Sequence, residues 1–216
     1  MPKLRVHNFA VSLDGYAAGC DQSADAPLGI GGERLHDWVF RTRYGRDMMG
    51  EPGGDPGPDN DILAAGDHNI GATIMGRNMF GPVRGEWPDH SWTGWWGDTP
   101  PYRHDTFVMT HHPRPALPMK GGTTFHFVAD TPEAVLKQAF ESAAGRDVRL
   151  GGGVSTVRRF LAAGLIDDLH LAIVPVLLGS GERLYDNLGT LPGYRLADML
   201  STGAVTHLWF TRAEAS

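Results

Sequence analysis

The sequence has little cysteine, an excess of acidic over basic residues and no long apolar run, and each shortage excludes a class of protein. Cys20 is the single cysteine in 216 residues, which excludes an internal disulfide and a zinc site built from several cysteines. No apolar run approaches the roughly 18 residues of a membrane-spanning helix, and residues 1–5 lead into a strand-like pattern instead of a signal sequence. We therefore expect a cytoplasmic protein with no membrane partner.

Charge and length narrow the class further. The chain carries 19 basic and 25 acidic residues, a formal charge of −6, whereas a nucleic-acid-binding protein usually presents a basic face. A chain of 216 residues fits one domain, residues 1–216, with a sizeable core. Two stretches read as insertions in that domain: 45–60 is rich in Gly, Pro and Asp and reads as a mobile loop, and 82–104 carries four tryptophans.

Apolar periodicity predicts an α/β fold. Helices are expected over 31–42, from Thr131-Pro132 to about Gly145, and after Gly153. Strands are expected over 4–11, 72–75, 106–110, 123–128, 148–150, 169–178 and 204–211, with Pro175 at an edge, at a bulge or at the start of a new strand. Strands and helices interleave until the last strands follow each other directly. This order favours a mainly parallel sheet with helices on both faces and an antiparallel C-terminal finish.

Two strands of this chain run into glycine where a helix should begin. The first corner is Gly76-Arg77, and the second comprises Gly151, Gly152, Gly153, Val154, Ser155 and Thr156. Glycine permits positive φ and close approach of a ligand, and the unpaired amides of the next helix attract phosphate. The two corners together indicate a dinucleotide. The alternatives are a solvated arginine beside an ordinary turn at the first corner and a tight turn with close backbone packing at the second.

The second corner differs from the G-x-G-x-x-G fingerprint, because position 156 is Thr and no acidic residue follows about twenty positions later. The loop from Thr110 to Arg114 gathers a hydroxyl, His111, His112 and an arginine after a strand. Adjacent histidines without metal-ligand spacing argue against a metal site. The loop is a candidate for holding an adenosine 2′-phosphate, and a solvated basic loop is the alternative.

The order of these segments resembles the reductase half of the bacterial riboflavin-biosynthesis deaminase/reductase, and more distantly dihydrofolate reductase. The matching segments are residues 11–16, 74–77, 108–110, 150–153, 165–170 and 175–181. The resemblance implies a dihydrofolate-reductase-like fold, NADPH as the hydride donor, a small-molecule substrate and a homodimer.

The same resemblance assigns roles to residues. Asp14 and Gly15 fall in the mobile loop over the nicotinamide, Gly76 and Arg77 at the first phosphate corner, and Thr110 and His111 on the adenosine side. The three glycines 151–153 fall at the pyrophosphate turn, which contains a cis Gly-Gly bond in dihydrofolate reductase. Gly179, Gly181 and Glu182 fall where the riboflavin enzymes approach their substrate.

The chain also departs from these families. It has no His-x-Glu paired with Pro-Cys-x-x-Cys, so it lacks the zinc-dependent deaminase site. Neither Glu33 nor Asp37 is a convincing counterpart of the buried carboxylate of dihydrofolate reductase, and we expect both at the surface. The sequence predicts an NADPH-dependent reductase of a small heterocyclic, carbonyl or imine substrate, with Asp14 as the candidate catalytic residue or a local hydrogen-bond acceptor. The alternatives are a pterin or other small-molecule reductase and a non-catalytic nucleotide-binding protein.

Overall fold

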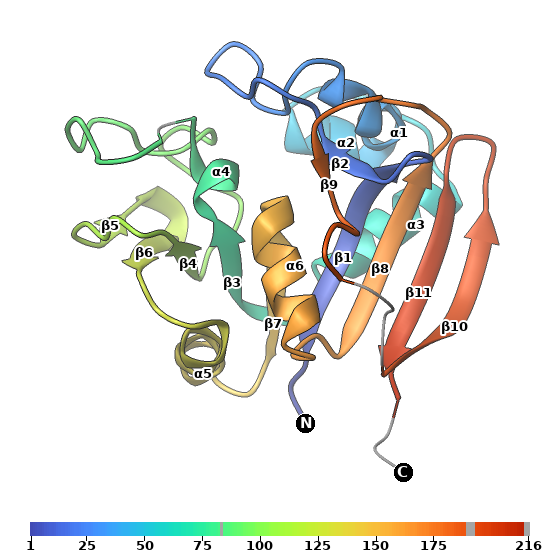
Figure 1. The fold of residues 1–216 in the computed structure, drawn as a ribbon. Helices are drawn as coiled ribbons and strands as arrows, with labels where there is room; N and C mark the ends of the chain where they lie inside the picture. The colour runs from blue at the N-terminus through green and yellow to red at the C-terminus, as the bar shows by residue number, and fades with distance from the viewer. Residues whose placement is uncertain (83, 189–192, 214–216) are drawn as a thin grey trace. The chain divides into compact units, whose positions relative to one another are not determined.

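A computed structural model describes residues 1–82, 84–188 and 193–213 (Figure 1). The chain forms two compact units, each built from two separate stretches of sequence. The first comprises residues 1–6 and 69–167, and the second comprises 7–68 and 168–216. The expectation of one domain stays a prediction. Within the described residues, no helix is long and apolar enough to cross a bilayer, and no cluster of three His, Cys, Asp or Glu side chains suits a metal ion.

The sheet of the first unit is parallel except at one edge. Its strands lie in the order β1-β7-β3-β4-β6-β5, and only β5 runs antiparallel to its neighbour. The strands are β1 (Leu4–Ser12), which continues into the second unit, β3 (Ile70–Gly76), β4 (Asp105–Met109), β5 (Leu117–Pro118), β6 (Thr124–Val128) and β7 (Asp147–Gly152). The helices are α4 (Arg77–Phe80), η2 (Lys120–Gly122), α5 (Pro132–Ala143) and α6 (Val154–Ala162).

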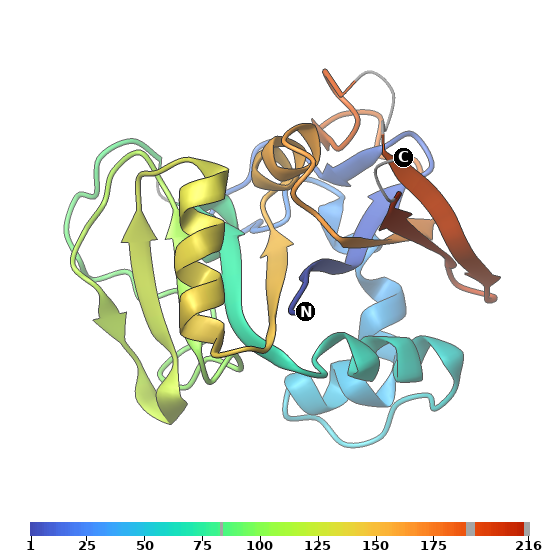
Figure 2. The same ribbon diagram turned by 90° about the horizontal axis from the view of Figure 1, so that it is seen from below.

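Helices α5 and α6 lie on opposite faces of β3. A Cβ added to Gly71 would meet Ala143 of α5, whereas one added to Gly76 would meet Thr156 of α6. Because side chains alternate between the faces of a strand, positions 71 and 76 point to opposite sides. Figure 2 shows α5 running along the strands that it covers. Thr131 caps α5 by accepting a hydrogen bond from the Ala134 amide, as the sequence predicts.

The second unit contains the antiparallel finish. Strands β8 (Asp168–Val174), β11 (Thr206–Arg212) and β10 (Tyr194–Ser201) are antiparallel neighbours, with β8 also beside β1, and β2 (Tyr16–Ala18) pairs with β9 (Glu182–Arg183). Its helices are η1 (Gly32–Leu35), α1 (Asp37–Arg41), α2 (Arg43–Met48) and α3 (Pro58–Gly66). The mainly parallel sheet and its antiparallel finish confirm the predicted fold class.

Three local predictions need correction. The expected helix over 31–42 divides at His36 into η1 and α1, and it ends at Thr42, which is extended and caps α2. The expected loop over 45–60 is shorter, since α2 reaches Met48 and α3 begins at Pro58. The strand expected to end at residue 178 ends at Val174, directly before Pro175, which cannot donate to a ladder. Strand β10 was not predicted at all.

A buried chain of hydrogen bonds links elements of the second unit. The Asn8 amide donates to His170 Nδ1 (3.0 Å), His170 Nε2 lies 2.9 Å from His207 Nδ1, and His207 Nε2 lies 3.0 Å from the Asp59 carboxylate. Burial, together with His7 and His207, lowers the pKa of His170 to about 2, so that its ring is neutral. Since Nδ1 accepts a hydrogen bond, His170 carries its proton on Nε2 and donates to His207, which in turn donates to Asp59.

Candidate functional site

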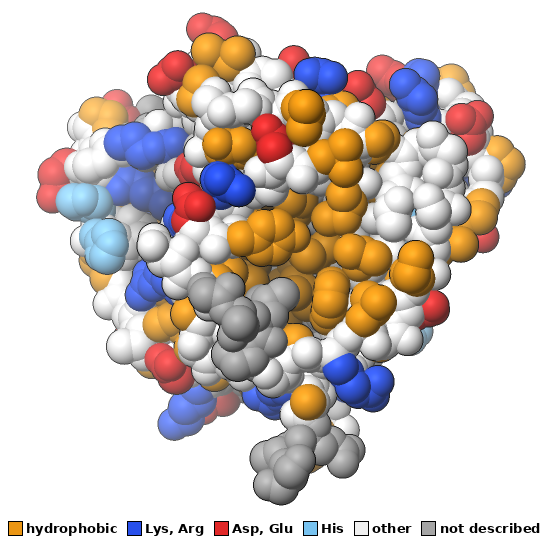
Figure 3. Space-filling view, turned by 45° about the vertical axis from the view of Figure 1, so that its right-hand side comes forward, with side chains coloured by type: hydrophobic (Ala, Val, Ile, Leu, Met, Phe, Trp, Pro, Cys, Tyr) orange, Lys and Arg blue, Asp and Glu red, His pale blue; other side chains and the backbone are white. Residues whose placement is uncertain are grey.

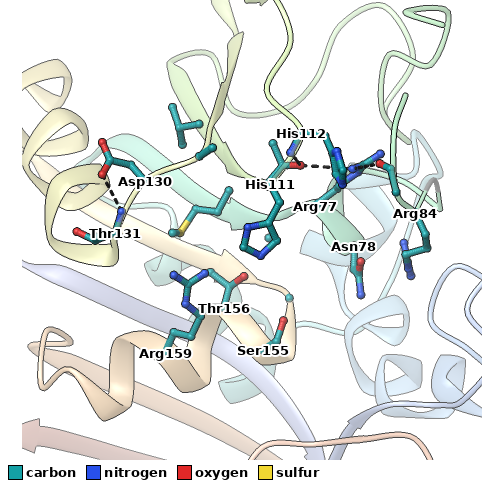
Figure 4. Close-up of a pocket in the computed structure, with 17 residues that line it drawn as sticks. Arg77, Asn78, Arg84, His111, His112, Asp130, Thr131, Ser155, Thr156 and Arg159 are labelled. Carbon is teal, nitrogen blue, oxygen red and sulfur yellow. Dashed lines mark hydrogen bonds between the residues drawn. The ribbon is translucent and has the colours of Figure 1, made fainter. Parts of the chain in front are cut away.

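A pocket of about 510 Å³ opens in the first unit, where β3, β4, β6 and β7 end (Figure 4). The carboxyl ends of parallel strands are the usual place for a ligand in an open α/β sheet. The lining residues are Gly76, Arg77, Asn78, Arg84, Gly85, Met109, Thr110, His111, His112, Val128, Ala129, Asp130, Thr131, Gly153, Ser155, Thr156 and Arg159. In Figure 4, Arg77 and Arg84 lie at one end of the pocket and Asp130 and Thr131 at the other.

The two glycine corners meet at this pocket. A Cβ on Gly153 would lie 3.0 Å from Gly76 Cα, and a Cβ on Gly76 would lie 2.4 Å from Thr156 Oγ1. Gly153 also has φ of 83°, which side chains rarely adopt. Close backbone packing therefore accounts for both glycines. The pocket beside them, with the side chains of Ser155 and Thr156 in its wall, is the feature that points to a ligand.

Three further residues of the second corner lie outside the wall of the pocket. Gly151, Gly152 and Val154 do not line it, and Gly152 and Val154 are buried. Every described peptide bond is trans, so the described residues contain no counterpart of the cis Gly-Gly bond of dihydrofolate reductase. Helix α4 after the first corner has only four residues, and its amides therefore offer a weaker anion site than those of the nine-residue α6.

Arg77 is the cation best placed to bind an anion in the pocket. Its Nη1 donates to the Gly85 carbonyl and, at 3.4 Å, to Thr110 Oγ1, whereas its buried Nε and Nη2 have no hydrogen-bond partner among the described residues. Burial lowers the pKa of the Arg77 guanidinium and Arg84 lowers it further, while Glu86 opposes the shift. The guanidinium stays charged because its ordinary pKa is so high. A guanidinium in the wall of the pocket suits a phosphate or carboxylate ligand.

The loop after β4 divides between pocket and core. Thr110, His111 and His112 line the pocket. Arg114 does not line it, because its guanidinium lies over the rings of Trp87 and Phe127. That this loop holds an adenosine 2′-phosphate stays a prediction.

Several pocket residues escaped the sequence analysis. Arg159 follows Ser155 by four positions on α6, so both lie on one face of that helix, and this spacing is a signal the sequence contains. Asp130 and Thr131 lie between the end of β6 and the start of α5, which places them at the same edge of the sheet. The sequence contains no comparable pattern that would have identified Arg84 or Asn78 as pocket residues.

The four tryptophans of residues 82–104 are half-buried. Trp87, Trp92 and Trp96 pack against a core cluster that includes Phe80 and Phe125. Trp95 contacts Trp92 edge to face, with ring centroids 4.7 Å apart. A role of this segment in excluding water from a reacting ligand stays a prediction.

Asp14 lies in the second unit and is an acceptor of several hydrogen bonds. Its carboxylate accepts from Ser12 Oγ at 2.6 Å, from the Gly179 amide at 2.7 Å and from the Leu178 amide at 3.2 Å. The Ser12 hydroxyl and then these amides lower the pKa of Asp14 to about 2. This geometry supports the local-acceptor interpretation, and a catalytic role stays a prediction.

The other second-unit candidates surround the small β2–β9 sheet. Gly15 has φ of 86° and faces the ring of Tyr185, while Gly181 packs against the Ala18 carbonyl and Glu182 pairs with Ala18 in the sheet. These contacts explain the two glycines structurally. Glu33 and Asp37 are exposed, as expected, so neither is a buried carboxylate of the folate-reducing type.

Known proteins share this fold at low sequence identity. A putative riboflavin biosynthesis protein from Shewanella sp. PV-4 superposes with a TM-score of 0.60, at 20% identity over 98% of this chain and 99% of its own. A pyrimidine reductase-like protein from Corynebacterium diphtheriae gives 0.55, at 14% identity and coverage of 99% and 93%. Dihydrofolate reductase from Enterococcus faecalis, complexed with NADP(H), gives 0.52, at 13% identity and coverage of 97% and 96%. The fold is thus dihydrofolate-reductase-like.

Sequence comparison agrees with the fold. The uncharacterized protein YyaP of Bacillus subtilis (strain 168) is 44% identical over 41 residues, which cover 19% of this chain and 22% of that protein. The model of one family, the RibD C-terminal domain, matches residues 2–208, nearly the whole chain. The pocket at the strand ends, the reductase-type structural neighbours and this match lead to one assignment. The chain belongs to the RibD C-terminal domain family.

Proposed function

We propose that this protein is an NADPH-dependent reductase of a small heterocyclic substrate with a reducible C=O or C=N bond, similar to 5-amino-6-(5-phosphoribosylamino)uracil reductase. The observation that carries the proposal is the pocket at the strand ends, with Arg77, Ser155 and Thr156 in its wall. The reductase-like family and the neighbour that binds NADP(H) support it.

The pocket residues fit a nicotinamide dinucleotide phosphate. The first amides of α6 and the hydroxyls of Ser155 and Thr156 would hold the pyrophosphate, because a helix N-terminus and hydroxyl donors favour an anion. Arg77, with Thr110 and His111 beside it, would hold the 2′-phosphate. The bound cofactor would supply the hydride. The chain's own task is to orient it against the substrate and exclude water, and we propose the substrate near Gly179, Gly181 and Glu182.

A cellular location also belongs to this proposal. The single Cys20 and the family of biosynthetic reductases favour a cytoplasmic enzyme. Folate reduction is the second candidate, favoured by the dihydrofolate reductase neighbour, but the exposed Glu33 and Asp37 argue against it.

We predict that Arg77→Ala weakens NADPH binding much more than NADH binding. Losing a charge-assisted contact removes about 1.5 to 3 kcal/mol, roughly ten- to a hundredfold in affinity. Both cofactors are titrated into wild type, Arg77→Ala and Arg41→Ala, which removes an exposed arginine of the second unit as a control. Equal losses for the two cofactors would show that Arg77 does not read the 2′-phosphate.

Turnover is screened with pyrimidine, pterin and quinone acceptors by loss of NADPH absorbance, and no turnover despite binding would favour the non-catalytic alternative.

A further inference from the structure

Two guanidinium groups lie over the indole ring of Trp87. Arg77 Cζ lies 3.8 Å from the ring centroid, and Arg114 Cζ lies 4.3 Å from it. Both distances are within the range of cation–π attraction, which is strongest for tryptophan and for cations removed from water. Of these three side chains, only Arg77 lines the pocket.

The Trp87 ring is itself held firmly. Its Nε1 donates to the His112 carbonyl at 2.6 Å, and it meets Phe80 and Phe127 edge to face at centroid distances of 6.1 and 5.6 Å. Arg114 lies over Phe127 at 4.2 Å and donates to the Trp92 carbonyl at 2.7 Å. The ring is therefore a fixed surface, set by the core and by the loop after β4.

This fixed surface limits where the Arg77 guanidinium can lie. Trp87 contacts it through the ring, and the neighbouring Gly85 carbonyl accepts from its Nη1. His112 Nδ1 lies 2.9 Å from the Glu86 carboxylate, which ties the segment 85–87 to the loop after β4. Burial of a cation without a counter-anion is unfavourable, and the electron-rich face of the indole offsets part of that penalty. Nε and Nη2 of Arg77 are buried and have no hydrogen-bond partner in the part of the chain that the structure describes.

We propose that Trp87 is a positioning residue that holds the Arg77 guanidinium ready for a phosphate group of the ligand, and so sets the preference for a phosphorylated dinucleotide. The inference rests on the proposed function for the identity of the ligand. The positioning itself concerns only Trp87 and Arg77 and can be measured without any ligand.

The first measurement is ligand-free. Phenylglyoxal modifies accessible arginines, and the rate at Arg77 is followed by peptide mass spectrometry in wild type, Trp87→Leu and Trp96→Leu. Trp96 is a matched control, because it packs in the same cluster, stacks with Phe125 and has no arginine over its ring in the described structure. We expect Trp87→Leu alone to raise the rate at Arg77 several-fold. An unchanged rate in folded Trp87→Leu would overturn the positioning.

The second measurement is the ratio of NADH to NADPH dissociation constants. We expect Trp87→Leu to lower this preference for NADPH about tenfold, Trp87→Phe to lower it less because a weaker aromatic face remains, and Trp96→Leu to leave it unchanged. A preference unaltered in both Trp87 variants would overturn the proposal, and Trp87→Phe decides it if Trp87→Leu does not fold. A wild-type protein that binds neither dinucleotide would end the proposed function, and the reaction at Arg77 would still decide whether Trp87 positions it.

Discussion

At the scale of single residues, the glycines of the second corner have different reasons to be glycine. Gly153 has a positive φ and would bring a Cβ within 3.0 Å of the Gly76 backbone. Gly151 has neither constraint, because a Cβ there would meet the flexible end of Met79 at 3.3 Å. Gly153 thus serves a close backbone contact, whereas Gly151 is a position that tolerates a side chain.

We predict that Gly153→Ala destabilises the protein and Gly151→Ala hardly does. A side chain at a left-handed position costs about 1 to 3 kcal/mol, and the fixed Gly76 backbone cannot yield to a new Cβ as a methionine side chain can. Urea unfolding of both variants measures the difference. NADPH titration of the folded variants then shows whether binding falls beyond the loss in stability. Equal unfolding free energies for the two variants would contradict this account of the corner.

Asp14 illustrates how hydrogen bonds can decide between two roles of one residue. We predict that Asp14→Asn lowers the melting temperature, because an amide group cannot accept all of the bonds from Ser12, Leu178 and Gly179. With a pKa of about 2, Asp14 should add no ionisation to the pH profile of turnover above pH 4. A variant with an unchanged melting temperature but much reduced kcat would instead support the catalytic interpretation.

At the scale of elements, strands β8, β11 and β10 form two apolar rows across their sheet. Leu171, Leu208 and Met199 are cross-strand neighbours, and so are Leu169, Phe210 and Leu196. Leu196 is 49% exposed and Met199 59%. Figure 3, turned so that this side comes forward, shows hydrophobic side chains gathered on the face. An exposed apolar patch of this kind is typical of an interface.

We predict that this face pairs two copies of the chain into a homodimer, because a two-fold partner presents the same apolar rows in return. Light scattering should give twice the 23.4 kDa of one chain. Met199→Lys should shift the protein toward the monomer, whereas Met49→Lys, at a methionine that is 63% exposed in the same unit, should not. A wild-type mass of one chain at micromolar concentration would refute the prediction.

At the scale of the whole molecule, the buried histidine chain makes stability depend on pH. The folded pKa of His170 is about 2 and its ordinary value is 6.5, so the unfolded chain binds an extra proton between these values. The contribution of His170 to the unfolding free energy is fully present above pH 6.5 and falls as the pH drops below 6.5. Asp14, with a pKa lowered from 3.8 to about 2, contributes in the same direction at lower pH.

We predict that the unfolding free energy falls by ~1 kcal/mol from pH 7.5 to 5.5 on account of His170. Urea unfolding at several pH values measures it. His90→Gln, at an exposed histidine, should keep the dependence, and nitrogen-15 NMR should find the His170 proton on Nε2 throughout this range. A protonated His170 in the folded protein at pH 5.5 would refute the assignment.

The parts of the fold that the sequence predicted are those governed by local interactions. Thr131 and Pro132 mark the start of α5 through a cap and a fixed φ, and the apolar stripe of α6 follows from its spacing. Strand β10 was missed because nearly all of its side chains are exposed, so it shows no alternation. Its position is decided by pairing with β11, which is a non-local interaction.

In the candidate site, too, the sequence predicted some residues and only the tertiary structure identified others. Glycine between a strand and a helix is a pattern visible along the chain, so Gly76 and Gly153 could be singled out from the sequence, together with Arg77 beside them, although the contacts that require glycine there come from distant segments. Only the tertiary structure brought both corners to one pocket, added Arg84 and Arg159 to its wall and placed Arg77 over the Trp87 ring. The physical reason is that a backbone conformation depends on neighbours along the chain, whereas the partners of a buried charge are selected by packing between segments that are distant in sequence.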